Sequence, residues 1–264
     1  MQLAEFITYH QPALQANEVK YNRILGLLAD AAAPKLRLWS FDSSGACAVQ
    51  RPCYSLVLGA LSQAECHRLA QEMQQSDFPG VVGCDETARW FVEHAIALGL
   101  AFREPMPQQI HALSEPPRYP GAAGHARRPS ATETPLFVDW MIAFHQQAVP
   151  PAPSREELEQ LAGEAFQLLW VVDGEPVSTA GIVRRTRPAA AISRVYTPPS
   201  FRGRGYAGSV TAAVVERIFA EGRSVACLHT DLRNPSSNRC YARVGFKPVC
   251  SSWHFARDRQ REAQ

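Results

Sequence analysis

The stretch Val195-Tyr-Thr-Pro-Pro-Ser-Phe-Arg-Gly-Arg-Gly-Tyr-Ala-Gly208 decides the fold of this chain. The apolar residues up to Tyr196 predict a strand, and the Pro198-Pro199 pair ends it. A loop rich in arginine and glycine follows and leads into residues 206–220, whose amphipathic pattern predicts a helix. A strand, such a loop and a helix in this order are typical of a phosphate-binding site.

The loop offers main-chain N–H groups to an anion. Gly203, Gly205 and Gly208 lack the Cβ atoms that would keep an anion away from the backbone. The same N–H groups are the unpaired donors at the start of the helix, whose dipole favours negative charge. Arg202 and Arg204 add fork-shaped donors that suit phosphate. We therefore expect a pyrophosphate to bind to this loop.

One family that binds pyrophosphate in this way has the dinucleotide (Rossmann) fingerprint. Gly203-x-Gly205-x-x-Gly208 fits it, and Asp231 ends the next expected strand about where a ribose-binding acid belongs. The fingerprint turns directly off its strand, however, whereas residues 197–202 intervene here. Too little chain follows Asp231 to complete a doubly wound sheet. A nicotinamide-dependent oxidoreductase is therefore the less favoured alternative.

A second family accounts for more of the sequence. Arg202-x-x-Gly205-x-Ala207 resembles the arginine/glutamine-x-x-glycine-x-glycine/alanine signature of the GNAT superfamily of N-acetyltransferases. The resemblance continues in an asparagine, a serine, a tyrosine and a glycine-phenylalanine pair, which are Asn234, Ser237, Tyr241 and Gly245-Phe246. In that family this second pattern marks the other half of the coenzyme A site. The resemblance covers about residues 132–256.

The resemblance implies an α/β fold with a mixed, splayed β-sheet flanked by helices. Two apolar runs flank Asp173-Gly174, which is a strong hairpin signal. After the hairpin we expect strands and helices to alternate over 190–197, 205–220, 225–231, 236–244 and 247–256. This is the element order of the GNAT fold.

The first half of the chain carries no recognised motif. We expect helices over 14–33, 62–75 and 85–98 and strands over 36–41, 54–58 and 101–113. This pattern predicts a smaller N-terminal α/β domain, and its element order also fits a diverged GNAT-like half. Proline and glycine punctuate the stretch that follows. We therefore predict an N-terminal domain over 1–114, a linker over 115–131 and a GNAT-like catalytic domain over 132–264.

The resemblance also implies which residues bind the cofactor. The backbone of Val195, Tyr196 and Thr197 would bind the pantetheine arm as an added strand, and Asn234 and Ser237 would contact the same arm. The loop expected at the pyrophosphate consists of Arg202, Gly203, Arg204, Gly205, Tyr206, Ala207 and Gly208. Simpler roles stay open: Tyr196 as a packed strand aromatic, Asn234 as a turn residue and Ser237 as a helix-start residue.

Tyr241 is the catalytic candidate. In matching family members the tyrosine hydroxyl points at the sulfur of coenzyme A, and a neutral phenol can protonate a departing thiolate. The alternative is a helix tyrosine packed against the sheet. No general base is identified, since 190–196 contains no carboxylate and His229 and Asp231 lie on the next strand. Without a base, an α-amine is easier to acetylate than a lysine-like amine, because about a tenth of it is free base at pH 7.

These observations predict an N-acetyltransferase that moves an acetyl group from acetyl-CoA to a primary amine of a small molecule, peptide or protein. The amine would attack directly in a ternary complex. Because no base is identified, a non-catalytic acyl-CoA-binding module is the alternative of a different class.

Composition excludes several other classes. The chain has 264 residues, 46% of them hydrophobic, and a formal net charge of +2 without clustered basic and aromatic residues, so nucleic acid is not an expected partner. Its seven cysteines show no C-x-x-C spacing and H-E-x-x-H is absent, so we expect no metal and no disulfide framework. No signal peptide or membrane-spanning run is evident. We expect a cytoplasmic protein that has no membrane partner.

Overall fold

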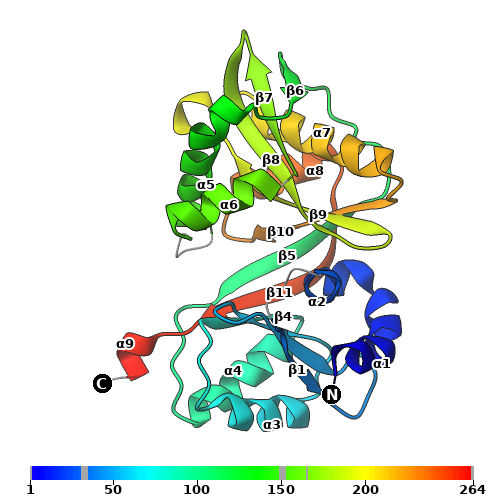
Figure 1. The fold of residues 1–264 in the computed structure, drawn as a ribbon, viewed down its shortest axis with the longest axis vertical. Coiled ribbons are helices and arrows are strands. Elements are labelled where there is room, and N and C mark those ends of the chain that lie inside the picture. Colours follow the sequence, from blue (N-terminus) through cyan, green and yellow to red (C-terminus); the bar gives the residue numbers. More distant parts are fainter. Residues whose placement is uncertain (1, 31–34, 149–152, 165, 263–264) are drawn as a thin grey trace. The chain divides into compact units, whose positions relative to one another are not determined.

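The computed structural model describes residues 2–30, 35–148, 153–164 and 166–262. By their contacts these residues form two compact units (Figure 1). Unit 1 comprises Met1–Ile110 and Pro248–Gln264, and unit 2 comprises His111–Lys247. The last strand of the chain therefore belongs to the same unit as the first strands.

Unit 1 contains a five-stranded sheet in the order β1-β2-β3-β4-β11. Its strands are β1 (Arg37–Ser40), β2 (Cys47–Gln50), β3 (Leu56–Leu58), β4 (Gly80–Cys84) and β11 (Lys247–Ala256). Only β3 and β4 are parallel neighbours; the other pairs are antiparallel. Strand β5 (Met106–Leu113) follows β4 in the chain, and the boundary between the two units lies within it.

Helices cover both faces of this sheet. They are α1 (Leu3–Gln15), α2 (Glu18–Ala29), α3 (Gln63–Met73) and α4 (Thr87–Ala97), with a short α9 (Arg259–Glu262) near the C-terminus. Successive residues of β2 face opposite sides, so Ala48 packs in the core with α3 and α4. Val49 packs in the core with α1 and α2. A sheet buried on both faces explains why these strands read as short apolar runs.

Unit 2 contains a second mixed sheet, in the order β10-β9-β8-β7-β6. Its strands are β6 (His125–Arg127), β7 (Phe166–Val172), β8 (Glu175–Arg185), β9 (Ala189–Tyr196) and β10 (Val225–Asp231). β9 and β10 are parallel, and the remaining pairs are antiparallel. The mixed, splayed sheet that the sequence predicted is confirmed.

Four helices flank the second sheet: α5 (Thr134–Ala148), α6 (Arg155–Glu164), α7 (Tyr206–Ala220) and α8 (Pro235–Val244). Single turns of 3₁₀-helix, η1 (Ala131–Glu133) and η2 (Pro199–Phe201), precede α5 and α7. Ile192 of β9 and Val214 of α7 share the core on one face. Trp140 of α5 packs with Leu169 on the other. The helix α7 therefore packs against the face of the sheet that carries Ile192 of β9, the strand before it in the chain.

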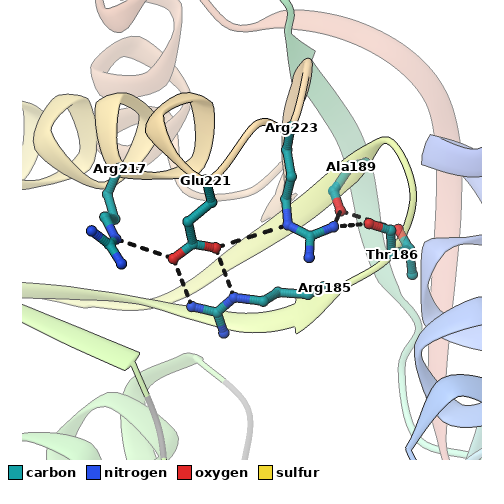
Figure 2. A network of polar contacts seen from close by, with 6 residues as sticks. All are labelled: Arg185, Thr186, Ala189, Arg217, Glu221 and Arg223. Atoms are coloured by element: carbon teal, nitrogen blue, oxygen red, sulfur yellow. Dashed lines mark hydrogen bonds and ion pairs between the residues drawn. The ribbon is translucent and has the colours of Figure 1, made fainter.

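A network of arginines fixes the C-terminal end of α7 to the β8–β9 hairpin (Figure 2). Arg185 of β8 donates to both carboxylate oxygens of Glu221, at 2.9 and 3.2 Å, and Arg217 donates to the same carboxylate at 3.1 Å. Arg223 lies within ion-pair distance of Glu221 and donates to the carbonyl oxygens of Thr186 and Ala189. The pKa of Glu221 is lowered, chiefly by its hydrogen bond with Arg185.

The structure differs from the expected elements in places. The expected helix over 14–33 is two helices, and the first begins at Leu3; residues 31–33 lie outside the described residues. The expected linker over 115–131 contains β6, which pairs with β7 from His125↔Val171 to Arg127↔Leu169. The contact-based units end at Ile110 and Lys247. Which parts fold independently, 1–114, 115–131 and 132–264, stays a prediction.

Candidate functional site

The sheet of unit 2 opens between β9 and β10. The parallel ladder runs from Ala189↔Val225 to Ile192↔Leu228 and ends there. Both strands nevertheless continue, β9 to Tyr196 and β10 to Asp231. The end of β9 therefore presents main-chain groups to a gap in the sheet, where an extended ligand can pair as a guest strand.

A β-bulge accounts for this opening. Between Thr179↔Tyr196 and Gly181↔Ser193, one residue of β8 lies opposite two residues of β9. Arg194 lies in this bulge with a φ of +57°, a left-handed conformation that is uncommon for a side chain of this size. An extra residue bends its strand and increases its twist. We attribute the divergence of β9 from β10 to this bend.

The predicted phosphate loop follows directly. Gly203 and Gly205 have φ values of +80° and +83°, which favour glycine. Gly205 is the N-cap residue of α7, so no side chain accepts a hydrogen bond from the first turn at that position. An uncapped N-terminus of a 15-residue helix suits an anion. Residues 203–207 lie at the start of α7, and their contact with a pyrophosphate stays a prediction.

Arg202 holds the loop in place. Its Nε donates to the carbonyl oxygen of Thr197 at 2.9 Å, and its Nη2 donates to Oε1 of Gln147 in α5 at 2.9 Å. Its guanidinium also lies 5.9 Å from the centre of the Tyr196 ring. These contacts give Arg202 a positioning role, and its direct contact with phosphate stays a prediction. Arg204 is exposed.

Gly208 serves packing in this structure. A Cβ atom at this position would lie 2.4 Å from Cζ of Tyr119. The Tyr119 hydroxyl donates to the carbonyl oxygen of Gly205 at 3.1 Å, and the N–H of Ala122 donates to Oγ of Ser209 at 2.7 Å. Residues 119–122 therefore lie against the first turn of α7. The sequence prediction placed this stretch in a linker and missed its contact with the loop.

The C-terminal end of β9 is held by contacts with α5 and β8. The Tyr196 ring lies 6.1 Å from the Trp140 ring of α5, centre to centre, and its carbonyl oxygen accepts a hydrogen bond from Oγ of Ser178 at 3.1 Å. Thr197 Oγ1 lies 2.8 Å from the same Ser178 hydroxyl. Val195 packs toward the α7 face. The packing role that the sequence left open for Tyr196 is thus present, and pantetheine binding by residues 195–197 stays a prediction.

The second motif forms the start of α8. Asn234 is the N-cap, and its Oδ1 accepts a hydrogen bond from the N–H of Ser237 at 3.1 Å. Asp231 pairs with Arg233 and also accepts its main-chain N–H at 2.8 Å. Asn234 and Asp231 therefore have structural roles here. Contact of Asn234 and Ser237 with a pantetheine arm stays a prediction.

Tyr241 lies half-buried on the inner side of α8. Its ring meets Phe246 edge-on, with the ring centres 6.2 Å apart, and packs against the core shared with α7. Burial, and to a lesser extent the neighbouring Cys240, raise the pKa of the phenol. At pH 7 Tyr241 is therefore neutral, a state in which it can donate a proton.

Two further searches concern the described residues as a whole. No helix in 2–30, 35–148, 153–164 or 166–262 combines the length and apolar character needed to cross a membrane. Within the same part of the chain, no three histidine, cysteine, aspartate or glutamate side chains group as a metal ion would require.

Comparisons with known proteins agree with this geometry. Residues 134–246 match the acetyltransferase (GNAT) family. A GCN5-related N-acetyltransferase from Kribbella flavida is 19% identical, with 92% of this chain and 95% of that chain covered and a TM-score of 0.62. An acetyltransferase of the GNAT family from Colwellia psychrerythraea is 12% identical, with coverages of 93% and 96% and a TM-score of 0.58.

A tandem GNAT protein from the clavulanic acid biosynthesis pathway is 11% identical, with coverages of 93% and 96% and a TM-score of 0.54. At such identities these structures establish the fold alone, and their coverage extends it over both units. No protein of curated function matches the sequence. From the family match and the shared fold, residues 134–246 are an acetyltransferase domain of the GNAT family.

Proposed function

We propose that this protein transfers an acetyl group from acetyl-CoA to a primary amine by direct attack in a ternary complex. The match of residues 134–246 to the acetyltransferase (GNAT) family supports the coarser statement, an acyltransferase that uses an acyl-CoA donor. The proposal of acetyl-CoA as donor rests on one observation. The end of β9 that borders the gap beyond Ile192 and Leu228 is followed in the chain by the uncapped N-terminus of α7.

The residues present fit coenzyme A. The end of β9 offers main-chain groups for the amides of a pantetheine arm, at Val195, Tyr196 and Thr197. The N-cap Gly205 has no side chain, which leaves the start of α7 open to a pyrophosphate. A Cβ atom at this position would lie 3.1 Å from the Tyr119 hydroxyl. When bound, acetyl-CoA supplies a thioester whose carbonyl carbon is open to attack by an amine.

Two parts of the chain would assist the transfer. The main-chain N–H at Val195 would polarise the thioester carbonyl at the gap. Tyr241 would donate its phenolic proton to the departing sulfur, and the raised pKa keeps that proton in place at pH 7. No carboxylate occurs in 190–196. This favours an acceptor whose amine is partly unprotonated at neutral pH, such as an α-amine of a small molecule or peptide.

Two alternatives are separated by simple measurements. A non-catalytic acyl-CoA-binding module would bind CoA without turning over any amine. A dinucleotide-dependent oxidoreductase would gain thermal stability from NAD(P) and not from CoA; the pairing of Asp231 with Arg233 and the packing of Gly208 on Tyr119 disfavour it. The free thiols of all seven cysteines suit a reducing compartment, and we propose a cytoplasmic location.

Calorimetry with CoA tests the site through two glycines at opposite ends of α7. Gly205 and Gly222 both have φ near +80°, so a valine strains the backbone similarly at either position. We expect the wild type to bind one CoA per chain, Gly205→Val to lose binding and the matched control Gly222→Val to keep it, since a Cβ at Gly222 meets nothing within 4 Å. Unchanged CoA affinity in a folded Gly205→Val protein would show that the phosphate loop is misassigned.

A further inference from the structure

Residues 119–122, here called the strap, lie against the first turn of α7 in unit 2. Upstream of the strap, Leu113 of β5 packs in the core with α7. Downstream of it, the carbonyl oxygen of Ala123 accepts a hydrogen bond from Nε1 of Trp170 at 2.9 Å, and β6 begins at His125. The strap is therefore held on both sides by contacts with the core and the sheet of unit 2.

Hydrogen bonds from the strap converge on one main-chain group of the phosphate loop. The Tyr119 hydroxyl donates to the carbonyl oxygen of Gly205 at 3.1 Å. Oγ of Ser209 donates to the same oxygen at 3.3 Å and accepts the N–H of Ala122 at 2.7 Å. The main-chain N–H of Ser209 also donates to this oxygen, at 3.1 Å, as the first bond of the helix. The strap therefore adds a direct and an indirect tie to the Gly205 carbonyl.

The start of α7 is shaped to receive the strap. A Cβ atom at Gly208 would lie 2.4 Å from Cζ of Tyr119, and a Cβ atom at Gly205 would lie 3.1 Å from the hydroxyl of the same tyrosine. Residues three apart in a helix are neighbours on its surface, so the two glycines face the strap together. Contact with the strap therefore favours glycine at both positions.

The conformation of Gly205 decides where the N–H groups of the loop point. Its φ of +83° is one of several conformations that a glycine adopts with similar ease. A loop free to sample all of them would lose that freedom when a pyrophosphate binds, and the loss would weaken binding. Hydrogen bonds that fix the Gly205 carbonyl before the ligand arrives remove part of this cost, because a larger fraction of the protein is then ready to bind.

We propose that Tyr119 is a positioning residue for the pyrophosphate of the donor, and that it acts through the Gly205 carbonyl by holding the phosphate loop in its binding conformation. This rests on the proposed acetyltransferase function. The hydroxyl bonds to the protein and not to the reacting atoms, so its effect is on donor affinity. It favours CoA thioesters over thioesters of pantetheine alone, because pantetheine has no pyrophosphate to place on the loop.

Calorimetric titration of the full-length protein with CoA tests this role. Tyr119→Phe keeps the ring that faces Gly208 and removes the hydroxyl that bonds to Gly205. We expect it to raise the Kd for CoA by about 3- to 10-fold, the effect of one hydrogen bond of ordinary strength. The matched control is Tyr9→Phe in unit 1. It also removes a hydroxyl that donates to a main-chain carbonyl, that of Asp42 at 3.0 Å, and should leave the Kd unchanged.

Fragments of CoA separate a positioned loop from a general loss of structure. Inorganic pyrophosphate and pantetheine are each used to displace CoA from the wild type and from Tyr119→Phe. The inhibition constant of pyrophosphate should rise by about the same factor as the Kd for CoA, and that of pantetheine should stay the same. Where a fragment displaces no CoA from the wild type, the Kd for CoA decides.

A second variant reaches the same carbonyl from α7. Ser209→Ala removes the hydroxyl that links Ala122 to Gly205, and it should also raise the Kd for CoA by about 3- to 10-fold. Thermal unfolding checks that each variant is folded. Should Tyr119→Phe fail to fold, the comparison of Ser209→Ala with the wild type decides.

The two proposals fail in different ways. Absence of CoA binding to the wild type contradicts the proposed function. If the wild type binds CoA and a folded Tyr119→Phe protein binds it equally well, the positioning role is overturned and the proposed function stands. A rise in the inhibition constant of pantetheine as large as the rise in the Kd for CoA also overturns it, because the hydroxyl would then support the whole site and not the phosphate loop.

Discussion

The contact between Gly208 and Tyr119 predicts that the effect of Gly208→Ala on stability depends on residue 119. The substitution should destabilise the wild type and stabilise a variant that lacks Tyr119. Gly208 lies in the first turn of α7 and has no positive φ, so alanine fits its backbone and would by itself stabilise the helix by up to about 1 kcal/mol. Its Cβ would, however, lie 2.4 Å from Cζ of Tyr119, where carbon atoms need about 3.5 Å. The tyrosine must move by about 1 Å.

Moving Tyr119 has a cost that can be estimated. Overpacking of this kind destabilises by about 1–3 kcal/mol, and loss of the hydrogen bond to the Gly205 carbonyl adds about 1 kcal/mol. After the gain in helix propensity, Gly208→Ala should lower the free energy of unfolding by about 1–3 kcal/mol. In a Tyr119→Ala background the clash is absent, and Gly208→Ala should raise that free energy by about 0.5–1 kcal/mol.

Urea unfolding of the wild type, both single variants and the double variant measures this coupling. Gly203→Ala in the same two backgrounds is the control, because a Cβ at Gly203 meets nothing within 4 Å and its effect should not depend on Tyr119. If Gly208→Ala has the same effect with and without Tyr119, the close approach of residue 119 to α7 is wrong, and Gly208 must be explained by the ligand instead.

Two further predictions concern catalysis and the network around Glu221. Tyr241→Phe keeps the ring that packs on Phe246, so CoA affinity in calorimetry should hold while kcat falls by about 10²-fold; a wild-type rate would make Tyr241 a packing residue. Glu221→Gln should lower the free energy of unfolding by about 1 kcal/mol at pH 7. Because the pKa of Glu221 is lowered in the folded state, this difference should be full above the ordinary pKa of a glutamate and should be lost as the pH falls through the lowered pKa of the folded state. A difference that persists in acid would contradict the assigned pairing.

Local signals in the sequence predicted local structure. Asp173 and Gly174 both have positive φ between β7 and β8, as a two-residue hairpin turn requires. The capping box that opens α3 is present in both directions between Ser62 and Glu65. Where the pattern misled, it was also local: the expected helix began at Leu14, whereas α1 begins at Leu3 and runs through Pro12.

Features that depend on distant residues could not be read in this way. The bulge at Arg194 exists only in relation to the register of β8. The packing role of Gly208 depends on Tyr119, which lies far away in the sequence. The assignment of β11 to unit 1 follows from its pairing with β4, from Ser252↔Cys84 to Ala256↔Gly80. Each needs a partner whose position the local pattern does not specify.

Unit 1 contains the same order of strand, helix and parallel strand as β9, α7 and β10, but it lacks a glycine-rich loop and an uncapped helix start. β3 leads into α3 and then into β4, which pairs with β3 at Leu56↔Val81 and Val57↔Val82. The connection from β3 to α3 spans only residues 59–62 and has no glycine-rich loop of the kind at 202–208.

The start of α3 is also already filled by the protein's own carboxylate. Glu65 accepts the N–H and the hydroxyl of Ser62, both at 2.7 Å, while Ser62 Oγ accepts the N–H of Glu65 at 3.3 Å. The main-chain N–H groups of Ser62 and Glu65 are thus engaged, and the negative charge of Glu65 would repel a pyrophosphate. At the start of α7, Gly205 leaves the equivalent place open. The difference between a glycine and a Ser-Glu capping box is therefore the reason to expect a single CoA for each chain, held by unit 2.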